Sequence, residues 1–68
     1  MDARFNEFTR KEVEYLVQEC NFTEQEERIF RMKTNGKSIV AIAIEEGVSD
    51  RTINRKLKRI RIKIHKAV

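Results

Sequence analysis

Nucleophilic and metal-binding side chains are scarce in this sequence, which contains one cysteine, Cys20, and one histidine, His65. A single cysteine cannot form an intramolecular disulfide, and one cysteine with one histidine cannot complete a zinc site of three or four protein ligands. Cys20 is the last residue on the apolar side of a helix predicted over about residues 10–20, and it is expected to act as a small hydrophobic residue. His65 lies near the carboxyl end and is expected to be an ordinary exposed residue. We therefore expect no enzyme, no metal or cofactor, and no small-molecule substrate.

Clustered carboxylates are the other candidates for acid–base or metal chemistry, at Glu24, Glu26 and Glu27. They follow Thr23 at the start of a predicted helix, where the helix dipole favours acidic side chains. Thr23 and Glu26 fit a capping box, as Thr9 and Glu12 do earlier in the chain. Helix capping therefore explains this cluster better than catalysis does.

Basic side chains are concentrated in the second half of the chain. Residues 1–36 carry 6 basic and 8 acidic side chains, whereas residues 37–68 carry 9 basic and 3 acidic, so the net charge of +4 divides into −2 and +6. Positive charge concentrated in one part of a protein attracts a polyanion, because neutralising phosphates releases the counterions condensed around nucleic acid. Nucleic acid is the natural candidate partner; the alternative is a solvated basic helix that keeps the protein soluble.

Caps and hydrophobic periodicity predict four helices, over about residues 10–20, 23–34, 38–46 and 50–65. Asn35-Gly36 and Gly47 end the second and third helices, since glycine adopts the left-handed conformation without a steric penalty. We expect one all-α domain over residues 1–68, in which an amino-terminal helix precedes a three-helix core with a helix-turn-helix. Residues 1–8 form a flexible arm or an extra turn docked through Phe5 and Phe8.

The last predicted helix has an apolar side and a cationic side. Its apolar residues follow at i, i+4, i+7 and i+11 and form one seam that must be buried, at Ile53, Leu57, Ile60 and Ile64. The rest of its circumference is polar, with Arg51, Asn54, Arg55, Lys58, Arg59 and Arg61. The helix over residues 38–46, the turn Gly47-Val48-Ser49 and this last helix have the architecture of a helix-turn-helix.

These features together resemble two families of bacterial DNA-binding domains. The matching residues are Phe22-Thr23-Glu24-Gln25-Glu26-Glu27-Arg28-Ile29-Phe30, Gly36-Lys37-Ser38, Ile42-Ala43, Gly47-Val48-Ser49, Thr52-Ile53 and Leu57. Over about residues 22–64 the chain is similar to the carboxyl-terminal domain of sigma factors and to LuxR-type regulators. The sigma-like version is closer, because LuxR-type domains add a further helix for dimerisation that is not among the four helices predicted here. The resemblance implies a transcriptional regulator or sigma-like factor that binds double-stranded DNA, with the helix from Ser49 in the major groove.

The resemblance also implies roles for individual residues. Base reading or contact at the groove edge belongs to the start of the last helix, at Asp50, Arg51, Asn54 and Arg55. Ser49 caps this helix and can add a phosphate contact, and Thr52 lies in the same turn. Phosphate contacts are also expected at the start of the preceding helix, from Lys37 and Ser38, with Lys33 and Thr34 as weaker candidates. Sequence-independent attraction to the backbone is expected from Lys58, Arg59, Arg61, Lys63 and Lys66.

One position departs from the family pattern, because Glu46 stands where a large apolar residue usually precedes the turn glycine. This leaves a gap in the expected core. Val40 and Ile44 lie towards the other side of the same helix, so either the first helix covers them or another protein does. Together with Ile62, which lies off the main seam, they could form a homodimer or partner surface.

Two other functions remain open alongside DNA-binding regulation. One is a protein-interaction module that docks on RNA polymerase or on another regulator, and the other is a DNA-binding accessory protein of a phage or mobile element. No apolar run approaches the roughly 20 residues that span a bilayer, and the amino terminus lacks the apolar core of a signal peptide. We therefore expect no membrane partner and a cytoplasmic location.

Overall fold

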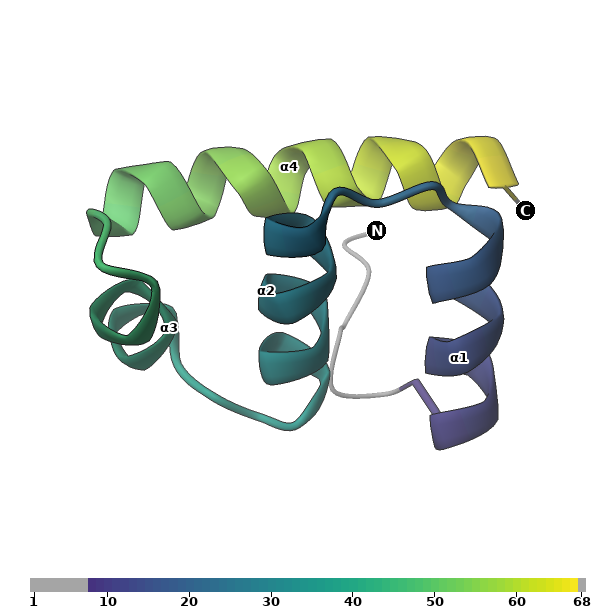
Figure 1. The fold of residues 1–68 in the computed structure, drawn as a ribbon, viewed down its shortest axis with the longest axis horizontal. Coiled ribbons are helices and arrows are strands. Elements are labelled where there is room, and N and C mark those ends of the chain that lie inside the picture. Colours follow the sequence, from purple (N-terminus) through teal and green to yellow (C-terminus); the bar gives the residue numbers. More distant parts are fainter. Residues whose placement is uncertain (1–7, 68) are drawn as a thin grey trace.

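The computed structural model describes residues 8–67 and contains four helices and no strand over that range. They are α1 (Arg10–Glu19), α2 (Glu24–Thr34), α3 (Ile39–Glu46) and α4 (Asp50–Ala67). The eighteen residues of α4 span about 27 Å at 1.5 Å per residue, nearly the full 29 Å length of the molecule. In Figure 1, α4 lies along one side and the three shorter helices pack beneath it, with α1 and α3 at opposite ends and α2 between them. The all-α four-helix prediction is confirmed.

Local sequence signals fix where α1 and α2 begin. Thr9 Oγ1 accepts a hydrogen bond from the Glu12 amide, and the Glu12 carboxylate accepts one from the Thr9 amide. Thr23 and Glu26 make the same pair of bonds at the start of α2. Both predicted capping boxes are therefore present, and each satisfies two of the amide groups that a helix leaves unpaired at its start.

The core is a single cluster of buried side chains, to which every helix contributes. The α4 seam is buried along its whole length, at Ile53, Leu57, Ile60 and Ile64. Ile29 and Phe30 of α2 and Ile42 of α3 are fully buried against it. The rings of Phe8 and Phe22 pack on Phe30 with centroid separations of 5.9 and 5.2 Å. Phe8 thus packs on the core, whereas Phe5, the other residue of the predicted docked turn, lies outside the described residues.

The connection between α3 and α4 is three residues long and depends on Gly47. Gly47 has φ +69° and ψ +33°, a left-handed conformation that costs a side-chain-bearing residue energy. The Val48 amide donates to the Ala43 carbonyl at 3.0 Å, which closes the end of α3. Ser49 Oγ accepts from the Thr52 amide at 3.2 Å and caps α4. The turn therefore holds the start of α4 rigidly beside the end of α3.

The outer face of α3 is left uncovered. Val40 is 54% exposed and Ile44 is 76% exposed, while Ile42 and Ala43 of the same helix are buried. Helix α1 contacts α2 and α4 and makes no contact with α3 within residues 8–67. The possibility that the first helix covers this face is therefore wrong, because α2 separates the two helices (Figure 1).

Candidate nucleic-acid interface

The outer face of α4 is the most cationic surface among the described residues. Because the apolar seam turns inward, the residues between its members turn outward, and Arg51, Arg55, Lys58 and Arg59 are all exposed. These four residues, which we call the α4 cations, follow at i, i+4, i+7 and i+8. A helix of 3.6 residues per turn places such positions on neighbouring rows of one side. They form one continuous positive ridge over the first half of α4.

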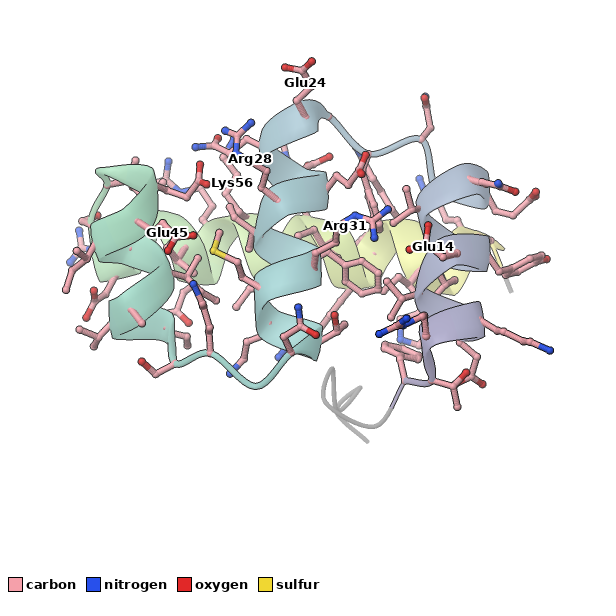
Figure 2. All side chains as sticks on the ribbon, turned by 60° about the horizontal axis from the view of Figure 1, so that its bottom comes forward. Glu14, Glu24, Arg28, Arg31, Glu45 and Lys56 are labelled. Atoms are coloured by element: carbon pink, nitrogen blue, oxygen red, sulfur yellow. The ribbon has the colours of Figure 1, made fainter. Side chains whose placement is uncertain are left out.

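Ion pairing distinguishes the α4 cations from four other basic residues of the domain. Within residues 8–67, Arg28 pairs with Glu46, Arg31 with Glu14 and Glu27, Lys37 with Glu45, and Lys63 with Glu26. Figure 2 shows Arg31 of α2 beside Glu14 of α1. None of the four α4 cations forms an ion pair or a side-chain hydrogen bond with any residue in the described range. Their charge is therefore available to a polyanion, whereas the paired cations are already neutralised by carboxylates.

Polar residues that could read bases lie at the amino-terminal end of the same helix. Asn54 is exposed and lies beside Arg51 and Arg55, and Asp50 is exposed in the first turn. The hydroxyls of Ser49 and Thr52 lie 3.1 Å apart, so each already has a partner within the turn. The side-chain amide of Asn54 and the guanidinium groups of Arg51 and Arg55 are thus free to make new hydrogen bonds. The hydroxyls of Ser49 and Thr52 mainly hold the turn together.

Lys37 and Ser38 form a separate group at the opposite end of α3. The eight residues of α3 place them about 12 Å from the turn, at 1.5 Å per residue. Ser38 Oγ accepts from the Ala41 amide at 3.1 Å and so caps α3, and Lys37 Nζ lies 2.9 Å from Glu45 Oε1. Both residues are exposed, so a phosphate could reach them, although Lys37 would have to share its charge with Glu45.

Lys63 does not belong with the outward cations, contrary to the expectation from sequence. Its Nζ donates to Glu26 Oε1 at 2.6 Å and to the Asn21 carbonyl at 3.3 Å. The Glu26 side chain is only 3% exposed. Burial alone raises the pKa of Glu26, but the hydrogen bonds from Lys63 and from the Thr23 amide outweigh it, so the pKa lies below its ordinary value. Lys63 thus neutralises a buried carboxylate and fastens α4 to the start of α2.

Glu46 does not leave the gap expected in the core. Arg28 of α2 donates to both of its carboxylate oxygens, from Nε and from Nη2, at 3.0 Å each. Gln25 adds a long contact at 3.5 Å, and the Glu46 side chain is 7% exposed. The hydrogen bonds from Arg28 lower the pKa of Glu46 against the opposing effect of burial. A bidentate ion pair thus joins α2 to α3 where the resembling families use apolar packing.

The sequence contains a signal for this pair, which helix capping and hydrophobic periodicity do not capture. A carboxylate at an apolar position of a helix needs a cation on the facing helix, because an unpaired buried charge is costly. Gln25 and Arg28 lie on one face of α2, three residues apart, and both reach Glu46. Helical spacing and charge together would have made Arg28 the leading candidate.

No cluster of metal-binding side chains forms within residues 8–67. The thiol of Cys20 is buried, and its pKa is raised by that burial and by the nearby Glu19. No group of three or more histidine, cysteine, aspartate or glutamate side chains could hold a metal ion in that range. None of the helices there is long and apolar enough to cross a membrane.

No family model, no curated protein and no solved structure matches the chain.

Proposed function

We propose that this chain is a double-stranded DNA-binding domain of the helix-turn-helix type, acting as a small transcriptional regulator or sigma-like factor. The observation that carries the proposal is the row of four exposed α4 cations on one side of the helix, none of which has an ion pair within residues 8–67. An α-helix fits the major groove of B-form DNA, where each base pair presents its own pattern of donors and acceptors. The sequence resemblance to sigma factors and LuxR-type regulators supports the same function.

The roles of the residues follow from their places on α4. Arg51, Asn54 and Arg55 lie near the amino-terminal end, which is the end that reaches base edges when a recognition helix enters the groove. Lys58 and Arg59 lie one to two turns further on and suit the phosphates that flank the groove. At the other end of α3, Lys37 and Ser38 suit a phosphate on the same duplex.

Titration of a fluorescently labelled duplex with the protein tests this proposal. Arg55→Ala is expected to weaken binding to a selected sequence by about 5- to 150-fold, because a bidentate arginine–guanine pair contributes roughly 1–3 kcal/mol. Lys58→Ala should weaken binding to every sequence and reduce the slope of log K against log salt by about one unit. Lys11→Ala is the matched control, since it removes one exposed positive charge from α1. Its affinity should match that of the unmodified protein.

Selection of bound sequences from a random duplex pool extends the test. Recovery of one preferred sequence would support base reading by Arg51, Asn54 and Arg55. Binding that depends steeply on salt but not on sequence would instead favour a DNA-binding accessory protein over a specific regulator. If the α4 variants and Lys11→Ala weaken binding equally, the groove-binding role of α4 is wrong.

A further inference from the structure

Among the described residues of α4, Ile62 is the only apolar one that is exposed. It is 48% exposed, whereas the seam on the same helix is buried. At about 100° per residue, the eleven positions from Arg51 bring Ile62 to within about 20° of the direction of Arg51, about three turns further along. Ile62 therefore lies on the side of α4 opposite the seam, in line with the α4 cations.

Basic residues flank Ile62 on this side of the helix. Lys58 and Arg59 lie four and three positions before it, and they point to either side of it because neighbouring residues are about 100° apart. Lys66 lies four positions after it and is also exposed. A second copy of this surface would place cations against cations and be repelled. Charge complementarity therefore favours a polyanion as the partner that covers Ile62.

The outer side of α4 is open along most of its length. Helices α1, α2 and α3 all lie on the seam side of α4 (Figure 1), and exposed residues continue from Arg51 to Lys66. This stretch is about 22 Å long at 1.5 Å per residue. An α-helix is about 10–12 Å across and the major groove is about 12 Å wide. The whole side can thus lie along a groove, so that residues beyond the first turns of α4 also approach the bases.

We propose that α4 lies lengthwise in the major groove and that Ile62 reads a thymine there through the methyl group on its C5 atom. Where Lys58 and Arg59 reach the phosphates on the two sides of the groove, Ile62 faces the bases between them. Thymine is the base that presents a methyl group in the major groove, and apolar side chains contact it. Seven positions, about 10 Å, separate Ile62 from Arg55, so this thymine lies apart from the base that Arg55 reads. The inference rests on the proposed DNA-binding function and adds a specificity residue and the base that it recognises.

The experiment uses a duplex recovered by selection from a random pool, in which each thymine is replaced in turn by deoxyuridine. Deoxyuridine pairs with adenine in the same way but lacks the methyl group on C5. For the unmodified protein, at least one replacement should weaken binding about fourfold, which is the effect of leaving one methyl-sized apolar group without its contact. The position of that replacement identifies the thymine that Ile62 covers.

Two variants link the lost methyl group to Ile62. Ile62→Ala should bind the thymine duplex about fourfold more weakly and should not distinguish thymine from deoxyuridine at that position. Its helix should be retained, because alanine has the higher helix propensity, and its slope of log K against log salt should be unchanged, since no charge is altered. Ile44→Ala, at an exposed isoleucine of α3, is the matched control and should keep the fourfold discrimination of about this size.

The possible failures are distinguishable. If the unmodified protein binds no duplex, the proposed function is wrong and this inference fails with it. If it binds DNA but selection recovers no preferred sequence, or every thymine can be replaced without loss, the inference alone is overturned. Discrimination against deoxyuridine that survives Ile62→Ala also overturns it. A dimer in solution that Ile62→Ala dissociates would overturn it as well, because Ile62 would then be covered by protein.

Discussion

Replacing Lys63 by methionine tests whether the ion pair with Glu26 fastens α4 to α2. Methionine keeps most of the length and apolar stem of lysine but removes the ammonium group, which donates to Glu26 Oε1 at 2.6 Å and to the Asn21 carbonyl at 3.3 Å. Glu26 then retains only the hydrogen bond from the Thr23 amide. A carboxylate whose side chain is 3% exposed is left without its cation.

The expected loss of stability follows from the burial of the two partners. Removing one member of a fully buried pair costs about 3–5 kcal/mol, because the other charge stays desolvated. The Lys63 side chain is 33% exposed, so water can replace part of what it donates, and we expect about 2 kcal/mol. For a domain of this size that corresponds to a fall in melting temperature of about 8–16 °C. Lys58→Met, an exposed and unpaired position on the same helix, should change stability by less than about 0.5 kcal/mol.

The dependence on pH gives an independent check. Because the pKa of Glu26 is lowered in the folded protein, its contribution to stability is complete above the unfolded pKa of about 4.3 and is lost as pH falls through the folded value. Without Lys63, burial should raise the pKa of Glu26, so the variant regains stability as this group becomes protonated. The difference between the two proteins should therefore be largest near neutral pH and shrink on acidification.

Urea unfolding followed by circular dichroism at several pH values measures these quantities. The double variant Glu26→Gln with Lys63→Met should recover most of the loss, since glutamine can still accept the Thr23 amide in a capping box without a buried charge. A loss that is the same at pH 7 and pH 4, or that glutamine does not relieve, would refute the role assigned to this pair. Equal effects of Lys63→Met and Lys58→Met would refute it as well.

Three further predictions concern the turn and the helix contacts, and each is measured by thermal unfolding. Gly47→Ala should lower the free energy of unfolding by about 1–2 kcal/mol, because φ is +69° at this residue. An added Cβ meets nothing within 4 Å, so the variant tests backbone strain alone. An unchanged melting temperature would contradict this. Arg28→Ala should destabilise the fold by about 1–2 kcal/mol, because it leaves the buried Glu46 carboxylate unpaired. The loss is kept small because the Arg28 side chain is half exposed. Adding Glu46→Leu to this variant should restore stability. Failure of that rescue would mean that the site cannot accept apolar packing. Thr23→Ala should cost about 1 kcal/mol by removing the α2 cap, and Thr23→Asn should retain most of it.

Local signals in the sequence determined the helices and their ends. The capping boxes at Thr9 and Thr23 and the glycine at position 47 act over three to five residues, so the surrounding fold has little influence on them. The buried seam of α4 was equally readable, because helical periodicity fixes which residues share a side whatever packs against it. Those features were sufficient to predict a four-helix fold and to name the outward face of α4.

Only the tertiary structure decided which charges are available on that face. Lys58 and Lys63 look alike in the sequence, yet Lys58 is exposed and unpaired within residues 8–67, whereas Lys63 is bound to a carboxylate 37 positions earlier in the chain. Likewise, Glu46 occupies an apolar position of its helix, and the cation that pairs with it, Arg28, lies 18 positions away in the chain. Periodicity and capping describe neighbours along one helix, but an ion pair between helices depends on how the helices cross. The sequence therefore determined where the helices form and which side of each is apolar, while packing decided which cations remain free to bind a partner.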